Sequence, residues 1–226
     1  GKRVAEMCDI WKAEWVGEEN RVVCVLAAQA ANPWTANAAL SCSLWEKAPC
    51  QSHGITAVAI FPSFGHYLGS SATGTELISW TKDTDGGLDR LFAELSDGGQ
   101  LTGGPEGGAL ALSALWTANY AKLANTRGLK LLAYEGGQHL AGVGATMQDN
   151  PAVTHLLVAA NRDPRMADIY QRMLDDWRNA GGGLYMHFYS MGQYGKSGSW
   201  GTLENMWQQS SPKLDTLKQY ILANPQ

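Results

Sequence analysis

The chain has 226 residues and a formal net charge of −4 at pH 7, which is long enough to bury one large hydrophobic core or two small ones. The acidic balance, with no basic cluster, argues against a nucleic-acid-binding protein. No apolar run approaches the roughly 18 residues that would span a bilayer, so no membrane partner is expected.

The first part of the chain alternates predicted helices with predicted strands. Apolar residues recur at helical spacing over 4–15, which predicts a helix. A run rich in β-branched residues predicts a strand over 21–29 that is buried on both faces, and a similar run predicts a second strand over 55–61. A helix over 36–45 is expected between these two strands.

The rest of the chain continues this alternation after an insertion over about 63–108, which is rich in Gly, Ser, Thr and Asp. The elements expected from there are helices 88–95, 109–126, 164–177 and 212–222 and strands 129–134 and 184–191. Alternation of this kind indicates parallel strands joined by right-handed crossovers. We therefore predict a single α/β domain over residues 1–226, built either as an open doubly wound sheet or as part of a (β/α)8 barrel.

A glutamate closes the strand expected over 129–134. This residue, Glu135, is followed by two glycines that allow the chain to turn sharply away. Parallel α/β sheets and barrels carry their chemistry at the carboxyl ends of their strands. Glu135 is therefore the candidate catalytic residue, and the alternative is a solvated carboxylate in a loop. The other expected strands end at Gln29, Phe61 and Tyr189.

Aromatic, histidine and amide side chains near the expected strand ends could bind a sugar. The apolar C–H faces of pyranose rings stack on aromatic planes, and polar side chains orient the hydroxyl groups. The candidate substrate-binding residues are Gln29, Trp34, His66, Tyr134, His139, Tyr189 and Trp200. For each single aromatic residue the alternative is packing. A metal bound by Glu135 and His139 is not expected, because the intervening glycines disfavour a helix that would place both on one face.

The chain contains four cysteines. Cys42 and Cys50 flank a short loop and could form a disulfide, whereas Cys8 and Cys24 lie in apolar patterns and are expected to be thiols of the core. Their spacing matches no zinc signature. We expect no metal and no other cofactor, and a secreted or extracellular location, although the chain shows no signal peptide.

Three segments resemble the C-terminal half of (β/α)8 glycoside hydrolases of the large retaining clan and related cellulose-active or cellulose-binding proteins. They read Val-Cys-Val-Leu-Ala-Ala-Gln at 23–29, Ala-Tyr-Glu-Gly-Gly-Gln-His at 133–139 and Gly-Ser-Trp-Gly at 198–201. The resemblance implies that the four strands are barrel strands five to eight and that Glu135 is the nucleophile after strand seven. It also implies that the acid/base carboxylate after strand four lies outside this chain. The implied partner is a polysaccharide or oligosaccharide, and the alternative function is carbohydrate binding without catalysis.

Retaining hydrolysis of a glycoside needs two carboxylates roughly 5 to 5.5 Å apart. The possible second carboxylates within this chain are Glu76, Asp83, Asp85, Asp149 and Glu204, all in expected loops. Half a barrel would also leave two unpaired strand edges and an apolar inner face. We therefore expect a homodimer with a two-fold axis, or association with the missing half of the barrel within a larger protein.

Overall fold

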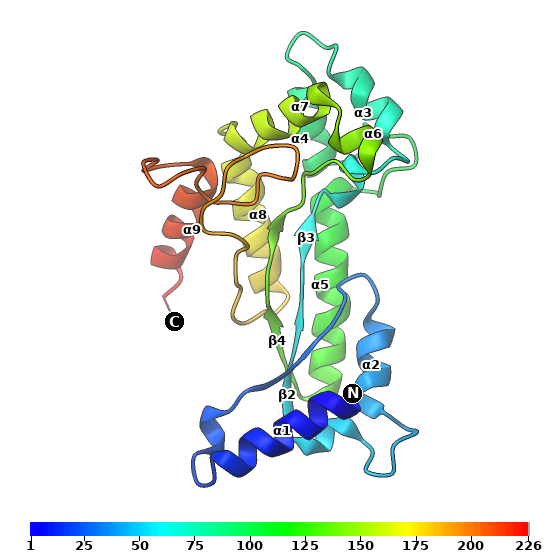
Figure 1. Cartoon of the computed structure of the whole chain (residues 1–226), viewed down its shortest axis with the longest axis vertical. Helices are drawn as coiled ribbons and strands as arrows, with labels where there is room; N and C mark the ends of the chain where they lie inside the picture. Colours follow the sequence, from blue (N-terminus) through cyan, green and yellow to red (C-terminus); the bar gives the residue numbers. More distant parts are fainter. Residues whose placement is uncertain (226) are drawn as a thin grey trace. The chain divides into compact units, whose positions relative to one another are not determined.

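The computed structural model describes residues 1–225, with helices and strands along the whole of that range (Figure 1). The helices are α1 (Lys2–Glu14), α2 (Pro33–Ser41), α3 (Gly74–Trp80), α4 (Leu88–Ser96), α5 (Gly108–Arg127), α6 (Ala145–Gln148), α7 (Pro151–Arg162), α8 (Met166–Asn179) and α9 (Pro212–Ala223). The strands are β1 (Cys24–Ala27), β2 (Ile55–Ile60), β3 (Ser63–Phe64), β4 (Lys130–Ala133) and β5 (Gly137–Gln138). Three short 3-10 helices are η1 (Glu19–Arg21), η2 (Cys50–His53) and η3 (His66–Gly69).

All pairs of strands are parallel, as the alternation of elements predicted. One sheet has three strands in the order β1-β2-β4, and β3 pairs separately with β5. The α/β class is therefore confirmed. The strands described over residues 1–225 do not close into a barrel, and the sheet contains three of the four strands expected for half of one.

The chain groups into two compact units. The first unit comprises Gly1–Pro62, Leu115–Gly136 and Trp177–Met186, and the second comprises Ser63–Ala114, Gly137–Asp176 and the chain from His187 on. The insertion expected over about 63–108 lies wholly in the second unit. The single domain over residues 1–226 stays a prediction.

The core of the first unit lies between its sheet and its helices. Strands β2 and β4 run side by side with Ala57 opposite Lys130 and Ile60 opposite Ala133 (Figure 1). One hydrophobic cluster joins buried side chains of all three strands to four helices, among them Leu26, Val58, Leu131, Ala5 of α1, Leu40 of α2, Tyr120 of α5 and Trp177 of α8. Burial of these apolar side chains is the main term that holds the helices on the sheet.

The first predicted strand is shorter and less buried than expected. It covers Cys24–Ala27 rather than 21–29, and its side chains alternate between buried and exposed. Cys24 and Leu26 face the core, whereas Val25 is 36% exposed. The prediction of burial on both faces was wrong, because β1 is an outer strand of the sheet and only the face that carries Cys24 and Leu26 is buried.

The fourth predicted strand, over 184–191, does not form. Tyr185 makes an isolated parallel bridge to Ala133, in which Met186 N donates to Ala133 O at 3.1 Å. Farther along, Tyr189 O accepts from Thr202 N at 2.9 Å. The backbone groups of this segment thus pair with two different partners, and each pairing satisfies donors and acceptors that a continuous strand would otherwise have used.

Three helices begin at a short polar residue followed by proline. Asn32, Asn150 and Ser211 cap α2, α7 and α9, and each side-chain oxygen accepts a backbone N–H of the first turn. Proline fits the first helical position because its missing N–H would be unpaired there anyway. The predicted helices 36–45 and 212–222 are confirmed with shifted ends, whereas α7 and α3 lie in regions that were expected to be loops.

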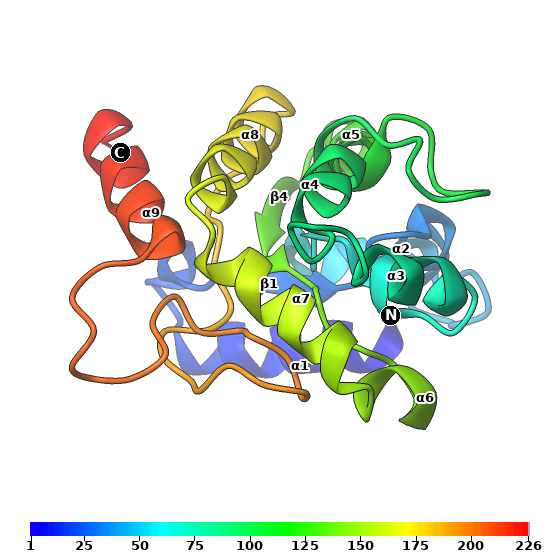
Figure 2. The ribbon, with the colours of Figure 1, turned by 90° about the horizontal axis from the view of Figure 1, so that it is seen from above.

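The second unit is mainly helical. Helix α7 packs against α4, and α3, α6 and α9 also contact α7 (Figure 2). Glu94 of α4 is fully buried, and its carboxylate accepts from Tyr67 Oη at 2.7 Å and from the backbone N–H groups of Gln100 and Leu101 at 2.8 and 3.2 Å. These three donors satisfy a charge that would otherwise be costly to bury.

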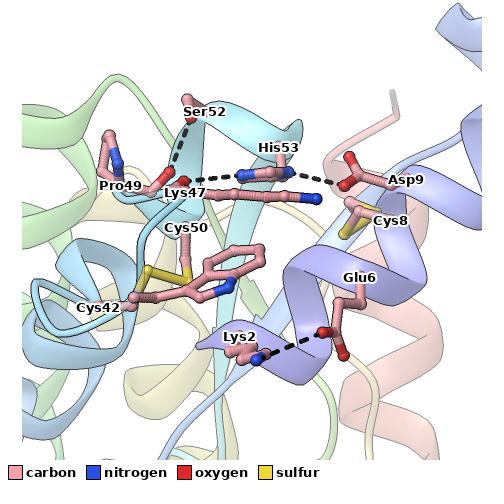
Figure 3. Close-up of polar contacts among 12 residues, drawn as sticks. Lys2, Glu6, Cys8, Asp9, Cys42, Lys47, Pro49, Cys50, Ser52 and His53 are labelled. Carbon is pink, nitrogen blue, oxygen red and sulfur yellow. Dashed lines mark hydrogen bonds and ion pairs between the residues drawn. A yellow bond between two sulfur atoms is a disulfide. The ribbon is translucent and has the colours of Figure 1, made fainter.

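Two disulfides stabilise the first unit. Cys42 pairs with Cys50, as the sequence allowed, and Cys8 of α1 pairs with Cys24 of β1 (Figure 3). The prediction that Cys8 and Cys24 are free core thiols was wrong, because the packing of α1 on β1 brings their Cα atoms to 5.8 Å. Two disulfides are compatible with an extracellular protein. Over residues 1–225, no helix has the length and apolar character needed to cross a membrane.

A histidine also links the disulfide region of the first unit to α1. His53 Nδ1 lies 2.7 Å from the carboxylate of Asp9, and His53 Nε2 lies 2.9 Å from the carbonyl oxygen of Lys47 (Figure 3). The contact with Lys47 and then that with Asp9 raise the pKa of His53. Its ring is also 4.8 Å from that of Trp45.

Candidate functional site

The carboxyl ends of the three strands of the first unit meet at one edge of the sheet. Beyond β4, Tyr134 N donates to Ile60 O at 3.1 Å, and Glu135 is the next residue. Beyond β1, Ala28 N donates to Ala59 O at 2.9 Å, and Gln29 follows. Because β2 lies between β1 and β4, the ends of β1 and β4 are separated by two strand spacings, or roughly 10 Å. We call Gln29, Trp34, Tyr134 and Glu135 the sheet-edge group.

A buried tyrosine fixes the loop that follows β1. Tyr120 of α5 is fully buried, and its Oη lies 2.7 Å from Gln29 O and 3.2 Å from Asn32 O. Asn32 in turn caps α2, whose first turn carries Trp34, and Trp34 is 71% exposed. Tyr120 therefore fixes the backbone at Gln29 and at Asn32. Through Asn32 it also fixes the start of α2, which carries the exposed indole of Trp34.

Glu135 is partly exposed and takes part in none of the ion pairs formed among residues 1–225. Burial and then the neighbouring Glu135 carboxylate raise the pKa of Tyr134, which is 42% exposed. Tyr134 consequently stays a neutral phenol that can donate a hydrogen bond. A carboxylate without a cation beside it remains available as a nucleophile or as a stabiliser of positive charge.

The second unit contains a separate group of rings. The ring of His139 lies 5.0 Å from that of Trp200 and 6.5 Å from that of His66, in both cases edge to face. The ring of Phe188 lies 6.2 Å from that of Trp200 and 5.5 Å from that of Tyr189. Phe188 and Tyr189 are 40% and 49% exposed. We call these five residues the aromatic–histidine cluster.

Polar side chains around β5 support this cluster. Gln138 is buried, its Nε2 donates to Ser199 O at 2.9 Å, and its Oε1 accepts from Leu140 N at 2.6 Å. Tyr170 Oη lies 3.0 Å from His187 Nε2. Burial, and then the charge of Lys213, lower the pKa of His187 to about 4, so this histidine is neutral at pH 7. His187 is thus a half-buried histidine held by a hydrogen bond with Tyr170.

The predicted site residues fall into these two groups. Gln29, Trp34, Tyr134 and Glu135 belong to the first unit, whereas His66, His139, Tyr189 and Trp200 belong to the second. Within the second unit, the structure brings His66, His139 and Trp200 together from η3, the segment after β5 and the loop before α9. Phe188 was not foreseen, although it lies next to Tyr189 in an aromatic run.

The five alternative carboxylates all serve local structure in the second unit. Asp83, Asp149 and Glu204 pair with Arg90, Lys196 and Arg162, Glu76 accepts from Thr102 N, and Asp85 accepts from Gly87 N and Asp89 N. Hydrogen bonds from Asp89 N and Gly87 N lower the pKa of Asp85, and those from Arg162 lower the pKa of Glu204. A general acid needs a raised pKa, so these two carboxylates are poorly suited to protonate a leaving group.

Two buried charged residues were missed in the sequence. Glu94 lies three residues after Leu91 on the apolar face of α4, so helical spacing could have shown that it is buried. Lys213 follows the cap of α9 and has the pattern of an exposed lysine in a first turn, yet it is fully buried. The local sequence around Lys213 does not indicate burial, because the residues that contact its ammonium, Asn161 and Ser199, lie far away in the sequence.

Comparison of the chain with protein-family models, with curated proteins and with solved structures gives no match. Within residues 1–225, no three His, Cys, Asp or Glu side chains are grouped closely enough to hold a metal ion. The side chains of the sheet-edge group and of the aromatic–histidine cluster therefore carry the functional argument.

Proposed function

We propose that this chain is a glycoside hydrolase-like protein that acts on a polysaccharide, with Glu135 as its nucleophile. The observation that supports this most directly is the position of Glu135, a partly exposed carboxylate outside the ion pairs of residues 1–225, just past the carboxyl end of β4. Parallel α/β folds carry their catalytic groups at this edge. Gln29 and Tyr134 would orient sugar hydroxyl groups, and Trp34 would stack on a ring.

A retaining glycosidase needs two carboxyl groups, a nucleophile and an acid/base, and in this proposal Glu135 is the nucleophile. Its carboxylate would attack the anomeric carbon, form a glycosyl ester and displace the leaving oxygen, which a second carboxylic acid must protonate. The other candidate carboxylates of this chain hold local structure, so we propose that the acid/base comes from outside it. In this proposal, β1, β2 and β4 are strands five, six and seven of a (β/α)8 barrel.

A second candidate function is carbohydrate binding without catalysis, in an extracellular setting. The aromatic–histidine cluster favours it, since Phe188 and Tyr189 are exposed rings beside Trp200 and two histidines. Exposed aromatic planes with polar neighbours suit the apolar faces and the hydroxyl groups of a sugar chain.

A Trp200→Ala variant is expected to bind insoluble cellulose about three- to tenfold more weakly than the wild type, because one aromatic stacking partner is lost. The measurement is a pull-down isotherm, run beside an assay for released reducing sugar. Trp207→Ala is the matched control, since Trp207 is 78% exposed and lies in the same unit outside the cluster. Binding without sugar release favours the second candidate, and equal losses in both variants contradict a role for the cluster.

The open edge of the sheet supports the proposal of a partner. β1 is an outer strand, and a groove of about 270 Å³ beside it is lined by Met7, Trp11 and Val25 among others. Met7 is 58% and Trp11 54% exposed. Unpaired strand edges with apolar neighbours favour association, and we propose that a second copy of this chain covers the edge.

The expected solution mass is therefore that of a dimer, and Trp11→Glu is expected to shift it to that of a monomer. Sedimentation equilibrium measures both masses. Leu222→Glu is the control, because Leu222 is 81% exposed and belongs to the second unit, whereas the residues that line the groove belong to the first. A monomeric wild type would contradict the homodimer and leave another polypeptide segment as the partner.

A further inference from the structure

A fully buried lysine lies in the second unit, and no carboxylate of residues 1–225 is in hydrogen-bond contact with it. Lys213 Nζ donates to Ser199 O at 2.7 Å and to Asn161 Oδ1 at 2.9 Å, and it lies 4.5 Å from the centre of the Tyr194 ring. Both oxygen acceptors are neutral. An ammonium in such a place is unfavourable on two counts, since it is removed from water and stands in the first turn of α9, where the helix dipole repels a cation.

The contact with Ser199 fixes the loop that carries Trp200. We call residues 192–201 the Trp200 loop. Ser199 O accepts from Lys213 Nζ and also from Gln138 Nε2, so one carbonyl ties the loop both to α9 and to β5. Trp200 is the next residue, and its ring meets that of His139, which follows Gln138 directly. The carbonyl held by Lys213 is therefore one residue from the contact that completes the aromatic–histidine cluster.

The rest of the Trp200 loop is held by hydrogen bonds within it, by a hydrogen bond from Gly192 N to Leu203 O at 3.0 Å and by one surface ion pair. Tyr194 Oη donates to Gly201 O at 2.8 Å, and Trp200 Nε1 donates to Ser197 O at 2.8 Å. Lys196 forms an exposed ion pair with Asp149 at 2.7 Å. Because exposed pairs contribute little, the buried hydrogen bonds to Ser199 O and to Gly201 O, on either side of Trp200, are the ones that can fix where its ring lies.

We propose that Lys213 is a positioning residue for carbohydrate recognition, which holds the Trp200 loop through Ser199 O so that the Trp200 ring stays against His139. The proposal rests on the proposed function for the ligand, a sugar chain, while the positioning itself concerns the protein alone. Hydrogen bonds from a charged donor are the strongest available for this purpose.

Charged and titratable groups on every side determine how this contact depends on pH. Glu204 faces Lys213 from the preceding loop and is itself bound by Arg162 of α7 at 2.7 and 2.6 Å. The centre of the Tyr194 ring lies 4.5 Å from the ammonium of Lys213. The charge of Lys213 also contributes to the lowered pKa of His187, which is neutral at pH 7. Burial lowers the pKa of Lys213 to about 7, and the opposing charge of Glu204 only partly offsets this. Raising the pH from 6 to 8 therefore replaces a charged donor with a neutral amine.

The first test needs no ligand. Hydrogen–deuterium exchange at pH 6 compares the wild type with Lys213→Met, which keeps the length of the side chain and removes its donors. Protection over residues 192–201 is expected to fall about tenfold, while that of α4 is unchanged. Lys196→Met is the matched control and should leave the protection near Trp200 as it is. Circular dichroism verifies folding, and Lys213→Gln replaces the variant if the methionine does not fold.

The second test uses insoluble cellulose and a double-mutant cycle. Lys213→Met should weaken binding about as much as Trp200→Ala does, and it should add little in the Trp200→Ala background, because both changes remove the same contact. The affinity of the wild type should fall between pH 6 and pH 8, whereas that of Lys213→Met should not change. A merely structural lysine would lower affinity in both backgrounds and would give no such difference in pH dependence.

Together, the two tests distinguish the positioning role of Lys213 from the proposed carbohydrate function. Unchanged exchange over residues 192–201 in Lys213→Met overturns the positioning role, as does full additivity in the cycle. Loosened exchange in a protein whose wild type binds no carbohydrate overturns the proposed function and leaves the positioning role of Lys213 in place. Loosened exchange together with a non-additive loss of binding supports both.

Discussion

A Glu135→Gln variant is expected to release no dinitrophenol from a dinitrophenyl glycoside that the wild-type chain cleaves. Glutamine has nearly the shape of glutamate but cannot attack the anomeric carbon, so the fold should persist while the covalent step fails. Loss of the attacking group costs roughly 10⁶-fold in kcat in a well-studied serine enzyme, and a fall of at least about 10³-fold is expected here.

The activated substrate matters because the acid/base is placed outside this chain. Dinitrophenolate leaves without being protonated, so the attack by Glu135 can proceed without a general acid, and the oxygen departs as the anion. Water then opens the glycosyl ester slowly, since no general base assists it. A wild-type chain should therefore gain the mass of one glycosyl residue, located on the peptide that contains Glu135.

The control for this experiment is Glu106→Gln, because Glu106 is an exposed carboxylate of the second unit. It should cleave the aryl glycoside as the wild type does. Cleavage by Glu135→Gln at the wild-type rate, or a glycosyl adduct on any other residue, would remove Glu135 from the mechanism. Absence of cleavage with every glycoside offered, together with binding to cellulose, would favour the carbohydrate-binding alternative.

The second large effect is expected from the Cys8–Cys24 disulfide. Removing it by Cys8→Ala and Cys24→Ala should lower the free energy of unfolding by about 3 kcal/mol, the value expected when a loop of about 15 residues is no longer closed in the unfolded chain. The two cysteines are 16 residues apart in the sequence. The bond also connects α1 to β1, an outer strand, so its loss should weaken the attachment of α1 to the sheet.

Urea unfolding of the double alanine variant and of the wild type measures this difference. The matched control is the wild type in reducing buffer, which should lose at least as much stability because it also loses the Cys42–Cys50 disulfide. A non-reducing peptide map should show Cys8 joined to Cys24. Equal stability of the wild type and the variant would mean that the unfolded chain is not restrained by this bond.

Local patterns in the sequence predicted most of the regular elements. Helical spacing in α1 and α5 and the β-branched run of β2 gave elements within a few residues of those observed. Helix α7 was missed although Asn150-Pro151 carries the same cap signal as Ser211-Pro212, so its start was readable in principle. The strand expected over 184–191 was predicted but does not form. Its residues favour a strand, but their backbone groups pair with two different segments of the chain.

By itself, the sequence determined the alternation of helices and parallel strands, and with it the position of Glu135 just past a strand, because spacing and chain turns act over a few residues. The tertiary structure alone decided that Cys8 meets Cys24, that Lys213 is buried against Ser199, and that His66, His139 and Trp200 share one cluster. These contacts join residues far apart in the chain, and their energies depend on which segments fold against one another. No spacing along the sequence specifies that choice.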